Sequence, residues 1–152
     1  MIALDTNILV YAHRKEYPQH KVARKIVLSL MNGTNHWAIP WPCLHEFIAV
    51  VTNARIFKKA SSIKEVEKVF DILLSSSKLN LLSEEENHLK ILLDLITQGS
   101  ISGGMVHDAR IAAICLSNGV SELWSADRDF SRFPKLTVSN PLISQESIRY
   151  TP

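Results

Sequence analysis

The chain has 152 residues, of which 46% are hydrophobic and 21% are charged. This composition is typical of one soluble globular domain and excludes a disordered chain. The formal net charge of +2 does not by itself indicate nucleic-acid binding, although a local basic patch would be enough to engage phosphates. Two cysteines, Cys43 and Cys115, cannot make a disulfide scaffold, and no apolar run could span a bilayer. We expect a single cytoplasmic domain over residues 1–152, without a membrane segment or secretion signal.

Short apolar strands alternate with amphipathic helices along the chain. Strands are predicted over residues 2–5, 37–40, 79–82, 122–127 and 136–139. Helices are predicted over residues 7–15, 18–33, 41–53, 61–76, 83–99 and 104–119. Two of these helices carry a Ser-x-x-Glu capping box, Ser62 with Glu65 and Ser83 with Glu86. The alternation predicts a parallel sheet covered by helices on both faces, an α/β sandwich.

Four carboxylates stand out by their positions in these elements. Asp5 and Asp127 end two predicted strands, at the edge where open α/β sheets place their ligands. Asp108 shares its helix face with apolar residues three and four positions further on, and Glu46 does the same. Both helical acids are therefore predicted to point inward.

Four acids that converge on one edge cannot all be ionised unless a cation lies among them. An all-oxygen ligand set favours a hard ion, Mg²⁺ or Mn²⁺, over zinc. Each acid alone is more often structural: Asp5 would cap the following helix, and Asp127 would be a turn residue. The joint pattern of two strand-end acids and two acids on apolar helix faces is what indicates a metal site.

The two acids of the segment SADRDF are predicted to point in different directions. In an extended strand they would lie on the same face, because side chains there repeat every two residues. The composition of this segment is turn-like, however, so the two directions should diverge. We therefore assign Asp127 to the site and expect Asp129 to bind the turn backbone or to pair with an arginine.

These acids lie in motifs that resemble those of the PIN-domain ribonucleases, and among them the VapC-type toxins of bacterial toxin–antitoxin pairs. LDTNILVYA resembles the family's opening D-[ST]-N motif, and PCLHEFIAVVTN resembles the segment that carries its second acid. VHDARIAAICLSNGVSELWSADRDFSRF is similar to the long C-terminal block, with its D-A-x-I-A-A and [ST]-x-D-x-D-F elements. The resemblance runs from Met1 to about Leu142, and the order and spacing of the motifs make it specific.

The resemblance implies a three-layer α/β/α fold with a five-stranded parallel sheet, and Mg²⁺- or Mn²⁺-dependent hydrolysis of RNA phosphodiester bonds. It carries the family's acidic site over to Asp5, Glu46, Asp108 and Asp127. The family's polar supporting positions match Asn7 and Ser125, the latter standing where many members have threonine. It also implies RNA as the substrate, a small antitoxin protein as inhibitor, and a homodimer.

Two other functions stay open at this point. Haloacid-dehalogenase-like phosphohydrolases also begin with a strand that ends in Asp, but they need a second Asp two residues later, where this chain has Asn7. A PIN fold without catalysis would serve only as a binding module, and the retention of all four acids argues against that. Metal-dependent RNase activity, compared with phosphatase activity on an aryl phosphate, separates nuclease from phosphatase.

Overall fold

A single parallel sheet organises the chain in the computed structural model. The structure describes residues 1–143, so the end of the predicted domain, residues 144–152, lies outside the described part. The strand order is β3-β2-β1-β4-β5, and every neighbouring pair is parallel. The strands are β1 (Ile2–Leu4), β2 (Trp37–Pro40), β3 (Leu79–Leu82), β4 (Glu122–Trp124) and β5 (Val138–Ser139). Because β1 is central, the residue that follows it lies at the middle of the sheet's carboxyl edge.

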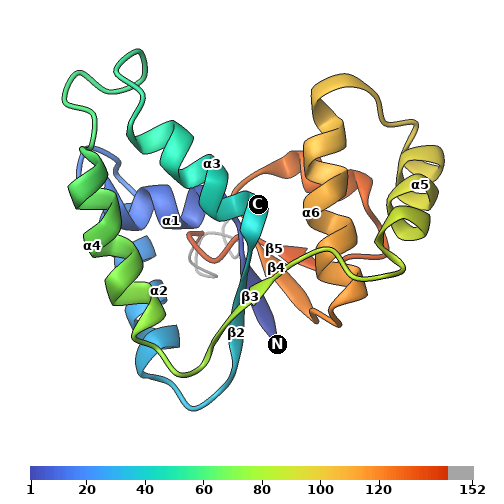
Figure 1. Cartoon of the computed structure of the whole chain (residues 1–152), viewed down its shortest axis with the longest axis horizontal. Coiled ribbons are helices and arrows are strands. Elements are labelled where there is room, and N and C mark those ends of the chain that lie inside the picture. The colour runs from blue at the N-terminus through green and yellow to red at the C-terminus, as the bar shows by residue number, and fades with distance from the viewer. Residues whose placement is uncertain (144–152) are drawn as a thin grey trace, which may run out of the picture.

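Helices cover both faces of the sheet (Figure 1). One layer contains α1 (Thr6–His13), α2 (His20–Asn32), α3 (Trp41–Val51) and α4 (Ile63–Leu74). The other contains α5 (His88–Gly99) and α6 (Val106–Ser117). Two short 3-10 helices complete the described part, η1 (Gly103–Met105) before α6 and η2 (Arg128–Arg132) after β4. The predicted three-layer α/β/α sandwich with a five-stranded parallel sheet is confirmed.

The central strands are apolar on both sides because a helical layer covers each face. All four residues of β2 are buried, and Ala3 and Leu4 of β1 have no exposed surface. Trp37 and Phe47 are among the largest fully buried side chains. Burying such a side chain stabilises the fold by roughly 1.5–3 kcal/mol relative to leaving it in water. The strand ends that support the acids are therefore fixed to a well-buried core.

The two predicted capping boxes have different outcomes. At the start of α4, the Glu65 carboxylate accepts a 2.7 Å hydrogen bond from the Ser62 N–H, and the Ser62 side chain accepts one from the Glu65 N–H. The capping box predicted at Ser83 does not form, because α5 begins five residues later and has no side-chain cap. The intervening segment instead contacts α6, where Arg110 binds Glu84. A tertiary contact has overridden the local capping signal.

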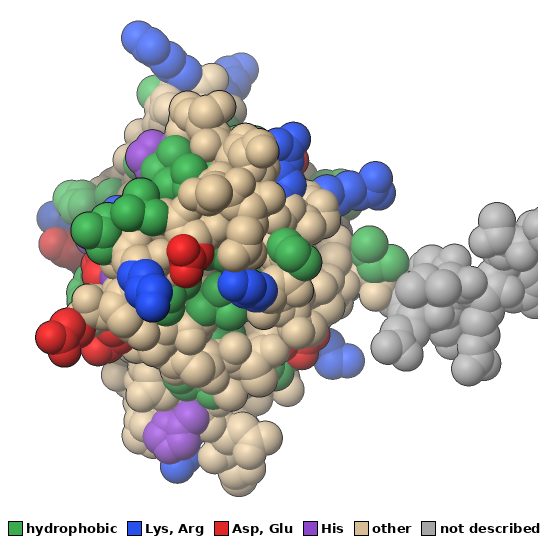
Figure 2. All heavy atoms as spheres, turned by 90° about the vertical axis from the view of Figure 1, so that its right-hand side faces the viewer, with side chains coloured by type: hydrophobic (Ala, Val, Ile, Leu, Met, Phe, Trp, Pro, Cys, Tyr) green, Lys and Arg blue, Asp and Glu red, His purple; other side chains and the backbone are tan. Residues whose placement is uncertain are grey.

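The outer surface of the α5–α6 layer is chemically mixed. Figure 2 shows hydrophobic side chains in small separate groups there, with basic and acidic side chains between them. The small positive net charge of the chain is therefore not gathered into a continuous basic track on the described part of this face. Within residues 1–143, no helix combines the length and the hydropathy needed to cross a lipid bilayer.

Candidate active site

Asp5 follows β1 directly, and its carboxylate is buried in a set of hydrogen bonds. Its Oδ1 accepts a 2.7 Å bond from the Thr6 N–H at the start of α1. Its Oδ2 accepts bonds from Asn7 Nδ2 at 2.7 Å and from Ser125 Oγ at 2.6 Å. The helix cap considered from the sequence is present. It coexists with long-range contacts that a simple cap would not need.

Burial is the largest influence on the ionisation of Asp5, and it raises the pKa of the carboxyl from 3.8 to about 6. The hydrogen bonds from Ser125 and Thr6 favour the ionised form and oppose this rise. The negative charges of Glu46 and Asp108 add to it. Even in its bonded setting, the charged form of Asp5 is therefore less favourable than in water, and a nearby cation would relieve this.

The two predicted supporting residues join distant parts of the chain around Asp5. Asn7 Nδ2 donates to Ser125 Oγ at 3.1 Å, and Asn7 Oδ1 accepts from the Ala126 N–H at 3.0 Å. Ser125 Oγ also accepts from the Asp127 N–H at 3.0 Å. Asn7 and Ser125 thus connect the start of α1 to the segment after β4, and they fix where that segment leaves the sheet.

Glu46 lies on α3 and borders the site from the other side of Asp5. Its Oε2 accepts a 2.9 Å hydrogen bond from Thr6 Oγ1. The sequence predicts that Glu46 points inward; the residue is exposed, but it lines the same pocket as Asp5. The α3 face that carries Glu46 and Val50 borders this open pocket. An apolar neighbour at helical spacing indicated the right face of the helix but not the depth of the acid.

Three further acids form the tightest cluster. Asp108, Asp127 and Asp129 each offer a carboxylate oxygen, and these atoms all lie within 4.8 Å of one another. Asp108 is half-buried, whereas the other two are exposed. Burial raises the pKa of Asp108, and the charges of Asp127, Asp129 and Glu46 raise it further. A cation bound among these carboxylates would relieve this crowding of like charges.

The cluster corrects the prediction for SADRDF. β4 ends at Trp124, so the strand does not reach Asp127 as predicted. Asp127 precedes η2 and caps it, because its Oδ1 accepts a 2.8 Å hydrogen bond from the Asp129 N–H. This tight turn brings the Asp129 carboxylate beside that of Asp127. The predicted divergence of the two acids is therefore wrong.

All four predicted acids line one pocket of about 240 Å³ at the carboxyl edge of the sheet. A neighbouring hollow of about 440 Å³ runs between α3 and α6 and is lined by His45, His107 and Arg110. Glu46 and Asp108 line both hollows. Glu46 belongs to α3 and Asp108 to α6, and Figure 1 shows these two helices on opposite sides of the sheet. The two acids thus stand at the junction of a longer cleft.

Several pocket residues were missed from the sequence. Thr6, Tyr11, Tyr17 and Phe130 all line the acidic pocket. Tyr11 lies four residues after Asn7 on the same helix, so helical spacing could have placed it there. Tyr17 belongs to the turn between α1 and α2, where no periodicity applies. Its position depends on tertiary contacts.

The donor set fits a hard divalent cation. The pocket lining contains Asp5, Glu46, Asp108 and Asp127, with the Thr6 hydroxyl and the Asn7 amide beside them. No histidine or cysteine of residues 1–143 lines this pocket, so its donors are those that Mg²⁺ and Mn²⁺ prefer and zinc does not.

Comparison with known proteins identifies the family to which this fold belongs. Residues 2–136 match the PIN domain family. The chain belongs to the PIN domain family. This PIN domain is 34% identical over 145 residues to VapC ribonuclease Mb2897 of Mycobacterium bovis, covering 95% of this chain and 98% of that protein. It is 29% identical over 142 residues to Ribonuclease VapC33 of Mycobacterium tuberculosis, covering 93% and 99%.

A solved structure extends the likeness to the whole fold. The PIN domain superposes with a TM-score of 0.64 on a chain of VapBC2 from Rickettsia felis, which was crystallised with a DNA fragment from the promoter of its genes. The two chains are 25% identical, and the match covers 92% of this chain and 98% of that one.

Proposed function

We propose that this PIN domain is a metal-dependent endoribonuclease and the toxin of a VapBC-type toxin–antitoxin pair. The convergence of carboxylates at the carboxyl edge of the sheet supports this most strongly. The names of the two VapC ribonuclease relatives support RNA as the substrate. The haloacid-dehalogenase alternative loses its support, because Asn7 is committed to hydrogen bonds with Asp5 and Ser125.

Asp5, Glu46, Asp108 and Asp127 would hold the ion. Asp129 would join them, since its carboxylate oxygen lies within 4.8 Å of those of Asp108 and Asp127. A bound Mg²⁺ or Mn²⁺ ion supplies a water nucleophile at neutral pH and polarises the scissile phosphate. Thr6 orients the Glu46 carboxylate through its hydroxyl, and the hydrogen bonds to Asp5 keep that carboxylate at the pocket. Without a cation, these carboxylates repel the phosphate backbone, so the empty site would be inactive.

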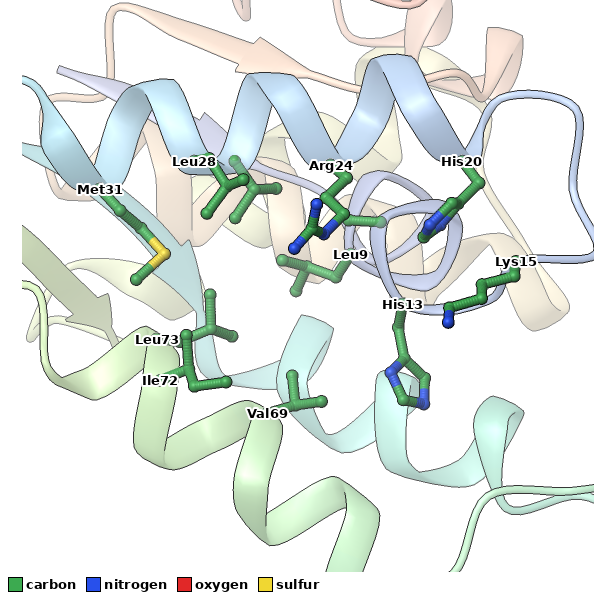
Figure 3. Close-up of a pocket in the computed structure, with 12 residues that line it drawn as sticks. Leu9, His13, Lys15, His20, Arg24, Leu28, Met31, Val69, Ile72 and Leu73 are labelled. Carbon is green, nitrogen blue, oxygen red and sulfur yellow. The ribbon is translucent and has the colours of Figure 1, made fainter.

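A second groove, of about 480 Å³, suits the antitoxin. It lies between α1, α2 and α4. Figure 3 shows Leu28, Met31, Ile72 and Leu73 at one end, the nitrogen-bearing side chains of His13, Lys15 and His20 at the other, and Arg24 between them. Apolar grooves of this kind take up the apolar face of an amphipathic helix. We infer that the antitoxin inserts such a helix, with acidic side chains toward the basic end.

The function is tested with the purified chain and a labelled single-stranded RNA. We expect Mn²⁺-dependent cleavage that EDTA abolishes, and no hydrolysis of an aryl phosphate. Asp5→Asn and Asp108→Asn should abolish cleavage while the proteins stay folded, whereas Asp71→Asn on the exposed side of α4 should cleave normally. Phosphatase activity without RNA cleavage would contradict the proposal. Sedimentation velocity tests whether the chain is the expected homodimer. Expression in cells with and without the adjacent reading frame tests whether the chain is toxic and whether a partner suppresses the toxicity.

A further inference from the structure

Two tyrosines form an aromatic wall in the acidic pocket. Tyr11 comes from α1 and Tyr17 from the turn that follows, and both line the pocket that holds the carboxylates. Their ring centroids lie 4.9 Å apart at an interplanar angle of 68°, an edge-to-face pair. Both side chains are only half-buried, so part of the aromatic surface faces the pocket.

Neighbouring side chains pack against the two tyrosine rings and fix their positions. The Tyr17 ring meets the Phe57 ring edge-on, with centroids 6.1 Å apart. The Arg14 guanidinium lies 4.1 Å from the centroid of Phe57, and Arg14 is itself buried and bound to Ser61 Oγ at 3.0 Å. His20 Nδ1 contacts the Tyr11 carbonyl oxygen at 2.9 Å. The two rings are therefore positioned before any ligand arrives, which lowers the entropic cost of binding one.

The hydroxyls of Tyr11 and Tyr17 lack hydrogen-bond partners in the described part of the chain. A buried tyrosine usually finds a hydrogen-bond partner for its hydroxyl. Within residues 1–143, neither Tyr11 nor Tyr17 forms a side-chain hydrogen bond through its hydroxyl, although the Tyr11 carbonyl and the Tyr17 backbone are both bonded. The rings thus border the pocket as accessible surface.

We propose that Tyr11 and Tyr17 form the stacking wall for the nucleobase next to the phosphate that is cut. This inference rests on the ribonuclease function proposed above. The acids around the metal repel every phosphate except the one that faces the cation, so the strand needs an attraction that does not depend on charge. Every nucleobase has a π-face, and an aromatic side chain can stack on it whatever the sequence. The wall lies in the same pocket as Asp5, Glu46, Asp108 and Asp127.

Substitution of the rings tests the wall. Tyr11→Leu and Tyr17→Leu remove the aromatic face, whereas Tyr11→Phe and Tyr17→Phe keep it. Phe70→Leu is the matched control, because Phe70 is a half-buried aromatic of α4 that packs on Phe47 outside the pocket. Each variant is assayed for steady-state cleavage of a short single-stranded RNA, for Mn²⁺ affinity by calorimetry, and for its melting temperature.

The Leu variants should lose about tenfold in kcat/KM, mainly through a higher KM, which corresponds to about 1.4 kcal/mol of lost stacking. Their Mn²⁺ affinity should not change, and the Phe variants and Phe70→Leu should keep the parental kcat/KM. Unchanged kcat/KM in both Leu variants, with normal cleavage by the parent, would exclude a stacking role for the tyrosines and leave the ribonuclease proposal intact. An equal loss of kcat/KM in the Phe variants would show that the tyrosine hydroxyls, and not the rings, bind the RNA. A parent chain that binds Mn²⁺ but cleaves no RNA would overturn both proposals.

Discussion

Ser125 donates a 2.6 Å hydrogen bond to Asp5, which precedes it by 120 residues, and both side chains are buried. The same hydroxyl oxygen accepts the N–H of Asp127 at 3.0 Å. One side chain thus positions a buried acid of the first strand and the start of the turn that carries two further acids. The relative positions of Asp5 and of the turn that carries Asp127 and Asp129 therefore depend on this hydroxyl.

We predict that Ser125→Ala lowers the free energy of unfolding at pH 7 by about 1–3 kcal/mol, because a buried ionisable acceptor loses a donor. The pKa of Asp5 should rise further, since the lost bond favoured the ionised form. Urea unfolding with EDTA present measures the stability change. Ser125→Thr keeps the hydroxyl and should stay near the parental stability; an equal loss in both variants would contradict the hydrogen-bond explanation.

Asp127 and Asp129 are expected to share metal binding but to differ in their structural role. Asp127→Ala and Asp129→Ala should each weaken Mn²⁺ binding at least tenfold in calorimetry, because both oxygens belong to the 4.8 Å cluster. Only Asp127 caps η2, so only its replacement should also lower stability, by about 1 kcal/mol. If Asp129→Ala keeps the parental Mn²⁺ affinity, Asp127 alone serves the metal site and Asp129 belongs to the turn, as the sequence predicts.

The stability of the metal-free protein should fall as the pH rises through the titration of Asp5. Its pKa is about 6 in the folded state against 3.8 as the ordinary value, so between these pH values the folded protein holds a proton that the unfolded chain has released. This proton uptake contributes about 3 kcal/mol to the free energy of unfolding. The contribution is complete below pH 3.8 and is lost as the pH rises past 6.

Urea unfolding of the parent and of Asp5→Asn between pH 4 and 7.5, with EDTA present, isolates this contribution as the difference between the two curves. The difference should change with pH mainly between 4 and 6. Saturating Mn²⁺ should stabilise the parent most at the upper end of this range, because the ion binds the ionised carboxylates. A pH-independent difference between the two proteins would contradict the raised pKa.

The groove between α1, α2 and α4 offers a matched pair of substitutions. Ile72 and Ile63 both belong to α4 and are both 58% exposed, but only Ile72 lines the groove. Ile72→Glu should weaken binding of the antitoxin at least tenfold, because an apolar contact is replaced by a desolvated charge. Ile63→Glu should bind normally, and both should cleave RNA as the parent does. Co-purification and titration measure the affinity; equal binding by both variants would exclude this groove.

The elements and the main acids could be predicted because their signals are local. Asp5 interrupts an apolar run, and Asp108 interrupts an apolar helix face, so each stands out against its immediate neighbours. The parallel sheet follows from the alternation of strands and helices, and a parallel sheet brings its carboxyl ends to one edge. The convergence of Asp5, Glu46, Asp108 and Asp127 on one pocket is therefore readable without coordinates.

Several of the failures concern contacts that local patterns in the sequence do not reveal. Ser83 has the local pattern of a cap, but the contact of Glu84 with Arg110 takes that segment out of the helix. The direction of Asp129 depends on a turn that Ser125 fixes from the sheet. The place of Tyr17 depends on Phe57, which lies forty residues away. None of these partners can be identified from propensity or periodicity.

The central position of β1 has a consequence for the synthesis of the protein. Its partner β4 is more than a hundred residues away, and the two strands lie side by side in the sheet. A ribosome-bound chain that has emerged only as far as α5 holds Asp5 and Glu46 but none of the three clustered acids. The cluster of Asp108, Asp127 and Asp129 cannot assemble until the segment through Asp129 has left the exit tunnel. On a shorter nascent chain the acidic pocket is therefore incomplete.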